Sequence, residues 1–190
     1  MTTPNDYNSF LSSVSAIPEF KTLFETETDR GCALLAAAIL DYELSLLLGN
    51  SFIDNNRINR KIFSPNGPLG TFSAKIDISY LLGHLPKDGF NKMHIIRNIR
   101  NEFGHSAIAL NFDVPSISQK IKTMALSINS ALATNRELFI RVVNKLLIQI
   151  HTASLLVHKA SEPEVIDFDA QKIIEKAAEV KISRTKENGN

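Results

Sequence analysis

Residues 135–159, NRELFIRVVNKLLIQIHTASLLVHK, are the stretch of sequence that decides the fold class of this chain. Apolar side chains recur in it at spacings of three and four residues, which is the period of one face of an α-helix. They are Phe139, Val142, Val143, Leu146, Ile150, Ala153 and Val157. A stripe of about six turns predicts a long scaffold helix that packs against other helices.

Similar patterns elsewhere in the chain predict the remaining helices. Apolar residues at helical period, bounded by turn residues, favour helices over 18–25, 27–48, 69–85, 87–104 and 116–131. Residues 52–63 are less regular, and residues 107–114 form a connection with room for a short extended piece. We therefore expect an all-α fold, a single-domain helical bundle.

The helix expected over 27–48 should belong to the core. Its apolar stripe, at spacings of three and four, consists of Leu35, Ile39, Tyr42 and Leu46. Residues at these spacings share one face of a helix, and that face is expected to be buried. Thr26, with Asp29 three residues later, resembles a capping arrangement at the start of this helix.

The two ends of the chain differ in character from the middle. Residues 1–16 mix Asn, Ser, Thr and Asp with isolated apolar residues, and we expect a flexible segment there. Residues 17–160 are assigned to the all-α domain. Residues 161–190 are expected to hold one amphipathic helix, between 167 and 180, and a disordered tail from 183 onward.

Composition points to a globular protein of a reducing compartment. The chain has 190 residues, 44% hydrophobic and 22% charged, with a formal net charge of +1. It lacks the basic excess of a dedicated DNA-binding protein. Cys32 is the single cysteine, so a disulfide framework is excluded.

Targeting signals are not expected either. The N-terminus lacks the continuous apolar region of a signal peptide. The longest apolar run, residues 32–40, is shorter than the roughly 20 residues that a membrane span needs. The sequence therefore predicts a cytoplasmic location.

The most specific local motif is Arg100-Asn101-Glu102-Phe103-Gly104-His105, in which a histidine follows an arginine by five positions. The motif resembles the signature of HEPN-type domains, many of which are metal-independent ribonucleases. The resemblance implies that His105 takes the proton of a ribose 2′-hydroxyl, that Arg100 holds the phosphate, and that Asn101 orients either of them. In that case the chain is an endoribonuclease or toxin, and its ligand is RNA.

A structural interpretation of the same residues stays open. Five positions on a continuous helix turn about 140° past a full revolution, so Arg100 and His105 come together only if the helix ends between them. In the structural interpretation the polar residues cap and cross-link helices, and Arg97 or Arg100 pairs with a carboxylate of Asp29, Asp41 or Glu43. The expected structural polar network consists of Asp29, Arg30, Asp41 and Arg97.

Neither a metal nor a cofactor is expected. The other histidines are His84, His94, His151 and His158, and no pair has the four-residue spacing of a helical metal site. Residues 66–70 (NGPLG) form a turn that lacks the lysine and serine of a phosphate-binding loop.

Three stretches occur in the order of the motifs of the mannitol operon repressor (MtlR) family. They are residues 27–37 (ETDRGCALLAA), residues 66–76 (NGPL followed by FSAKI) and residues 95–105 (IIRNIRNEFGH). The chain resembles this family from about residue 18 to residue 108. The resemblance implies an all-α bundle in a bacterial cytoplasm that represses transcription without a familiar DNA-binding domain.

These features predict a transcriptional regulator, a repressor of the mannitol type, that acts through protein–protein contacts and not by direct base readout. No helix-turn-helix pattern is present. We expect a protein partner and a homodimer, since two-fold dimers are the commonest soluble assemblies. The alternatives are the HEPN-like ribonuclease, which would make the chain an enzyme, and a non-catalytic interaction module.

Overall fold

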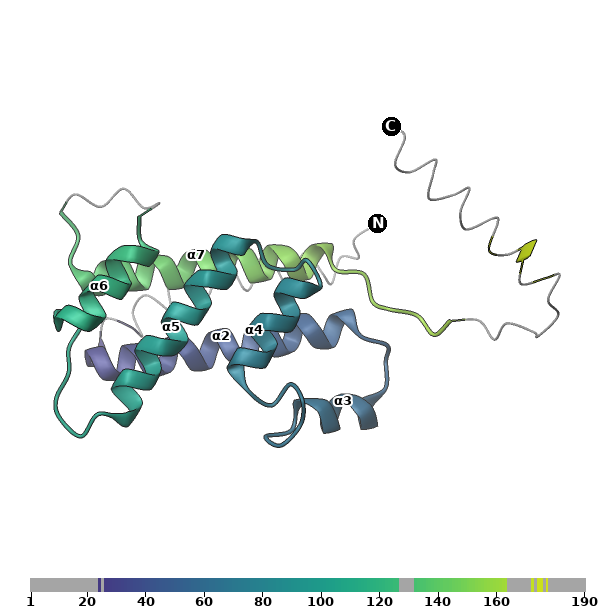
Figure 1. The fold of residues 1–190 in the computed structure, drawn as a ribbon, viewed down its shortest axis with the longest axis horizontal. Helices are drawn as coiled ribbons and strands as arrows, with labels where there is room; N and C mark the ends of the chain where they lie inside the picture. Colours follow the sequence, from purple (N-terminus) through teal and green to yellow (C-terminus); the bar gives the residue numbers. More distant parts are fainter. Residues whose placement is uncertain are drawn as a thin grey trace. The chain divides into compact units, whose positions relative to one another are not determined.

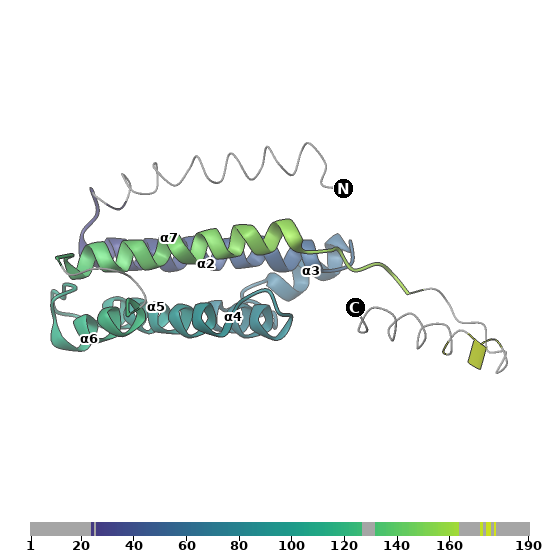
Figure 2. The same cartoon turned by 90° about the horizontal axis from the view of Figure 1, so that it is seen from above.

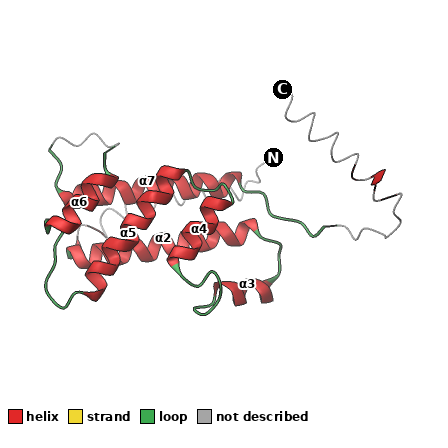
Figure 3. Cartoon of the chain, viewed as in Figure 1, coloured by secondary structure: helices red, strands yellow, loops and turns green. Residues whose placement is uncertain are grey.

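The computed structural model describes residues 24, 26–126, 132–163, 172, 174, 175 and 177. The described helices are α2 (Asp29–Ser51), α3 (Asn56–Phe63), α4 (Phe72–Leu81), α5 (Lys87–His105), α6 (Pro115–Met124) and α7 (Asn135–Leu156). No strand occurs among the described residues, as Figure 3 shows, so the all-α prediction is confirmed. Some predicted segments lie outside the described residues. They are the flexible segment predicted for 1–16, the tail predicted from 183, and nearly all of the helices predicted for 18–25 and 167–180.

The helices form two layers. In Figures 1 and 2, α2 and α7 lie side by side in one layer, and α4, α5 and α6 lie in the other. Helix α5 contacts α2, α4, α6 and α7, and α2 contacts α4, α5 and α7. Residues 1–160 form one compact unit, and residues 161–190 form another.

Helix α2 buries a different face from the one its apolar spacing predicted. The buried residues are Cys32, Ala33, Ala36, Ala37, Leu40, Leu44, Leu47 and Leu48. Of the predicted stripe, Leu35 and Ile39 are only half-buried, Tyr42 is 61% exposed and Leu46 is 44% exposed. The helix is apolar on most of its circumference, so periodicity alone did not select the face. The buried face is the one whose small side chains allow neighbouring helices to approach closely.

Burial also makes the single thiol inert. Cys32 is fully buried in α2, and this burial raises the pKa of its thiol to about 12, with Arg136 lowering it in part. A thiol that stays protonated at neutral pH is neither a nucleophile nor a metal ligand. Cys32 therefore serves the packing of the core.

Helix α7 confirms the prediction made from residues 135–159. It begins at Asn135 with a capping box, in which Thr134 accepts from the Glu137 backbone N–H and the Glu137 carboxylate accepts from the Thr134 backbone N–H. Its buried residues are Leu138, Phe139, Val142, Val143, Leu146, Leu147 and Ile150. The helix ends at Leu156, slightly before the predicted boundary.

Helices α4 and α3 differ from the sequence-based predictions, α4 in where it ends and α3 in that it forms at all. Helix α4 stops at Leu81 because Gly83 takes a left-handed conformation, with φ of 77°, that a side chain would disfavour. The Gly83 and His84 N–H groups then donate to the carbonyls of Tyr80 and Ser79, the pattern of a Schellman motif. Helix α3 was not predicted, because its sequence is polar and it buries no residue.

One arginine joins the starts of the two longest helices. Arg136 of α7 donates to the Asp29 carboxylate of α2 at 2.5 Å and to the backbone carbonyls of Phe24 and Glu27. The same carboxylate accepts from the Phe112 backbone N–H at 2.8 Å. Asp29 is thus occupied in tertiary contacts, and Thr28, not Thr26, caps α2 by accepting from the Gly31 N–H.

By length and composition alone, α2 and α7 are each apolar enough to cross a membrane. In the structure, 44% of the apolar window of α2 and 39% of that of α7 are buried inside the protein. The core of a helical bundle requires helices of this composition, so the bundle itself accounts for their hydropathy.

Candidate functional site

The second half of α5 carries the polar residues singled out by the sequence. Ile96, Ile99 and Phe103 of this half are fully buried and fix the helix to the core. The polar residues beside them are Arg97, Asn98, Arg100, Asn101, Glu102 and His105. They form a ridge, with a depression on each side, which we call the α5 ridge.

Helix α5 does not end between Arg100 and His105, which corrects the sequence-based expectation. It continues through Gly104 to His105, with Ser106 as its C-terminal cap. Gly104 is exposed and has no positive φ, so it occupies an ordinary helical position. The two side chains therefore leave the helix in directions about 140° apart.

The first depression lies between α5 and α6 and has a volume of about 470 Å³. Its lining residues are Asn98, Asn101, Glu102, His105 and Lys120. Lys120 of α6 donates to Glu102 Oε1, and Glu102 Oε2 is buried without a hydrogen bond. His105 is exposed, and its ring has no hydrogen-bonding partner within the described part of the chain.

The second depression, which we call the arginine cavity, lies between α2, the start of α4 and α5, and has a volume of about 440 Å³. Arg97 and Arg100 line it. Arg97 Nη1 donates to Ser73 Oγ at 2.8 Å, and Arg97 Nη2 donates to Asn98 Oδ1 at 3.1 Å. Arg100 Nη1 donates to Asn101 Oδ1 at 3.0 Å across the ridge.

The structure therefore brings Arg100 together with Asn101, and places Asn101 beside His105, but separates Arg100 from His105. One chain does not form the arginine–histidine pair that the ribonuclease interpretation requires. Such a pair would have to be completed by a second copy of the chain.

The residues of the expected structural network are placed in separate contacts. Arg30 donates to the backbone carbonyls of Ser106 and Ile108, at 2.9 and 3.0 Å, and so holds the segment that follows α5. Asp41 accepts from Lys75 of α4 at 2.8 Å. As with Asp29, this carboxylate meets a cation from a neighbouring helix.

The pairing expected for Arg97 or Arg100 is therefore wrong. Arg136 holds Asp29, Lys75 holds Asp41, and His151 contacts Glu43 at 3.1 Å. These cations lie on α4 and α7, which flank the carboxylates of α2, whereas the two arginines project from α5 toward other partners.

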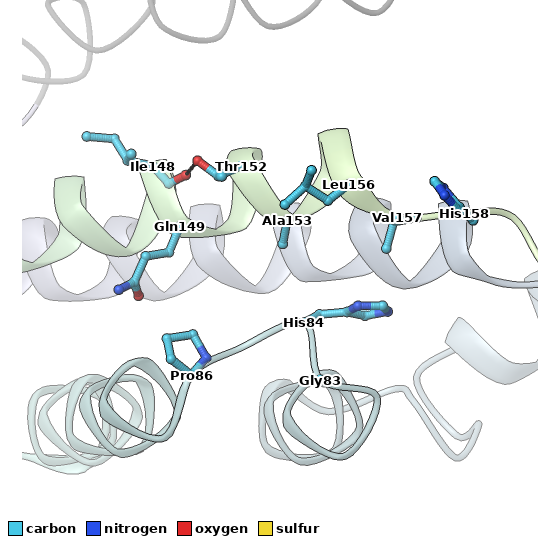
Figure 4. A pocket seen from close by; sticks show the side chains of 10 residues that line it. All are labelled: Gly83, His84, Pro86, Ile148, Gln149, Thr152, Ala153, Leu156, Val157 and His158. Carbon is cyan, nitrogen blue, oxygen red and sulfur yellow. Dashed lines mark hydrogen bonds between the residues drawn. The ribbon is translucent and has the colours of Figure 1, made fainter. Parts of the chain in front are cut away.

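A third cavity, of about 530 Å³, lies between the last turns of α7 and the connection from α4 to α5. Figure 4 shows Gln149 pointing from α7 toward Pro86, with the His84 ring beneath Val157. Gln149 Oε1 is buried and has no hydrogen bond. The sequence analysis did not identify this cavity, although Gly83 marks the turn that forms one wall.

The hydrogen bonds of Ser51 fix the tautomer of His84. The Ser51 hydroxyl donates to the Leu47 carbonyl at 2.8 Å, so it accepts from His84 Nε2 at 2.9 Å. The proton of the neutral ring then lies on Nε2, and Nδ1 is an acceptor. Partial burial lowers the pKa of His84 below its ordinary value of 6.5, which favours this neutral form.

No group of three or more His, Cys, Asp or Glu side chains is arranged to hold a metal ion in the described ranges. His94 and His151 contact single carboxylates, Asp77 at 2.9 Å and Glu43 at 3.1 Å. Each of these contacts is an isolated pair between two helices.

The helical arrangement is similar to that of a chain in the X-ray structure of the MtlR-HPr complex from Escherichia coli. The chains are 16% identical, the match covers 75% of this chain and 99% of that chain, and the TM-score is 0.58. At this identity the likeness shows the fold alone. No known protein family and no curated protein matches the sequence.

We predict that His84 makes the stability of the fold depend on pH. Because its pKa is lowered in the folded state, the unfolded chain binds a proton more readily below about pH 6.5, and stability falls as the pH falls. Thermal unfolding followed between pH 7.5 and pH 5 should show a shallower decline for His84→Asn than for the unsubstituted chain. The matched control is His158→Asn, an exposed histidine of the same cavity, and equal slopes for all three proteins would refute the assignment.

We also predict that His105→Ala leaves stability nearly unchanged, because the ring is exposed and makes no tertiary hydrogen bond to a described residue. The expected change is within about 0.5 kcal/mol, or a melting shift of at most about 2 °C. Ile99→Val, a buried substitution on the same helix, should cost about 0.5–1.5 kcal/mol and calibrates the measurement. A loss of several degrees in His105→Ala would mean that the histidine cross-links the fold, and loss of a measured RNA-cleaving activity would restore the ribonuclease interpretation.

Proposed function

We propose that this chain is a cytoplasmic regulator of the mannitol-repressor type, a repressor that acts on transcription by binding a protein partner. The observation that carries the proposal is the similarity of its helical arrangement to a chain from a complex between MtlR and HPr. Residues 27–37, 66–76 and 95–105, which resemble motifs of the MtlR family in the same order, point in the same direction.

The electrostatics of the chain support contact with a protein over contact with DNA. The formal net charge is +1, whereas a protein that neutralises several phosphates carries a basic surface. Lys75 of α4 and Arg136 of α7 meet carboxylates of α2 and are used inside the bundle. We infer that any effect on a promoter is exerted through the partner.

Within one chain, the α5 ridge supports a binding role more than a catalytic one. The expected base, His105, and the expected phosphate ligand, Arg100, face different depressions of the same chain. A catalytic pair must lie within hydrogen-bonding reach of one reacting group.

We propose that the protein acts as a homodimer, because closed two-fold dimers are the commonest assembly of soluble proteins.

The experiment that tests this function compares a protein ligand with a DNA ligand. Purified HPr from the source organism is titrated into the full chain by calorimetry, and a promoter fragment of its mannitol operon is titrated by fluorescence anisotropy at physiological salt. We expect HPr to bind with a dissociation constant on the order of micromolar, and the promoter to bind no better than a scrambled fragment. Tight, sequence-specific promoter binding without HPr binding would contradict the proposal.

A further inference from the structure

The arginine cavity combines cationic residues with a partly open volume, and the function proposed above does not use it. Two arginines of α5, Arg97 and Arg100, line it. The small side chains of Ala37 and Ala38 form its wall on α2. Its volume of about 440 Å³ lies within the range of small-molecule sites.

One donor of Arg97 is unsatisfied. Arg97 is half-buried, and its Nη atoms are held by Ser73 and Asn98, but its Nε is buried and has no hydrogen-bonding partner. A buried N–H of a charged group without an acceptor is costly, and native proteins rarely leave one. Because this Nε has almost no accessible surface, a ligand in the cavity reaches it only when the guanidinium turns.

The charges in the cavity do not cancel. The carboxylate in its lining is that of Asp41, which accepts from Lys75 Nζ at 2.8 Å, and Lys75 is itself buried. Asp41 and Lys75 therefore neutralise each other, while Arg97 and Arg100 contact only neutral oxygens in the described structure. The cavity holds about two uncompensated positive charges.

The start of α4 adds to the positive potential. Thr71, the N-terminal cap of this helix of 10 residues, lies in the cavity lining next to Gly70 and Phe72. Its hydroxyl accepts from the Ala74 N–H, which leaves earlier N–H groups of the first turn for another acceptor. The N-terminus of a helix favours negative charge, and here it faces the same space as the two arginines.

We propose that the arginine cavity binds the phosphate group of a small phosphate monoester. A phosphate monoester carries a charge of about −1.5 to −2 at neutral pH, which matches two guanidinium groups. It offers several acceptor oxygens, and the planar fork of arginine binds such groups through paired hydrogen bonds. Leu34, Ala37 and Phe72 provide an apolar wall for the organic part of the ligand. This assignment does not depend on the regulatory function proposed above.

Thermal unfolding and calorimetry of the full chain test the proposal with three probes at constant ionic strength. The probes are inorganic phosphate, glycerol 3-phosphate and a short single-stranded RNA. Glycerol 3-phosphate is expected to bind and to raise the melting temperature at concentrations up to about 10 mM, with inorganic phosphate binding more weakly because it makes no contact with the apolar wall. Chloride at the same ionic strength is expected to have no such effect.

Matched charge variants locate the binding. Arg100→Gln removes an exposed arginine of the cavity and should weaken glycerol 3-phosphate binding on the order of tenfold. Arg141→Gln removes an exposed arginine of α7 outside the cavity and should leave binding unchanged. Because Arg97 also contacts Ser73, the effect of Arg97→Gln is measured only after its circular dichroism spectrum matches that of the unsubstituted chain.

Three results would overturn the proposal. The first is no binding of either phosphate probe. The second is equal weakening by Arg100→Gln and Arg141→Gln, which would indicate attraction to net charge alone. The third is binding of the RNA, but not of the small phosphates, with loss in both Arg100→Gln and His105→Ala, which would assign Arg100 to a nucleic-acid site.

Discussion

The contact between Arg136 and Asp29 is the constraint on which the rest of the bundle depends. It joins the first turn of α7 to the first turn of α2, two positions 107 residues apart, and the same guanidinium holds the backbone that enters α2. Asp29 also accepts from the Phe112 N–H, so the segment between α5 and α6 is held at the same point. The Phe112 ring then packs edge-on against Phe103 of α5, with centroids 5.5 Å apart, and stacks on Phe139 of α7 at 4.8 Å. The polar contact thus joins α2 to α7, the aromatic contacts join α5 to α7, and Phe112 takes part in both.

This arrangement determines which side chains can act together. Helix α5 is anchored by Phe103 and by the segment held at Asp29. These anchors fix the rotation of the helix about its own axis, and so fix the directions in which its polar residues point. That rotation turns Arg97 and Arg100 toward α2 and α4, and Asn101 and His105 toward α6. An arginine and a histidine that look like one motif in the sequence are therefore parts of two surfaces. The side facing α2 is concave and positive, which suits an anionic ligand, and the side facing α6 is shallow and of mixed charge.

The sequence predicted the elements of the fold better than their contacts. The stripe over 135–159 was sufficient for α7, because only one face of that helix is strongly apolar. Apolar periodicity failed to identify the buried face of α2. Apolar residues surround most of this helix, and the buried face is the one with Cys32 and the alanines. The partners of Asp29 and Asp41 were not predictable from spacing, since each lies on a different helix. A glycine in the motif suggested a helix end before His105, yet Gly104 is tolerated inside α5 because it faces solvent. The arginine cavity depends on three helices, and of its lining residues only Asp41, Arg97 and Arg100 had been singled out as candidate site or network residues.

The measurement that tests this account most directly is a double-mutant cycle between Asp29 and Arg136. The free energy of unfolding is measured by denaturant titration for the unsubstituted chain, Asp29→Asn, Arg136→Gln and the double variant. The account predicts a favourable coupling on the order of 1–3 kcal/mol, because the two side chains are half-buried and share one hydrogen-bonded network. Additive effects, with a coupling below about 0.5 kcal/mol, would contradict the claim that this contact organises the bundle.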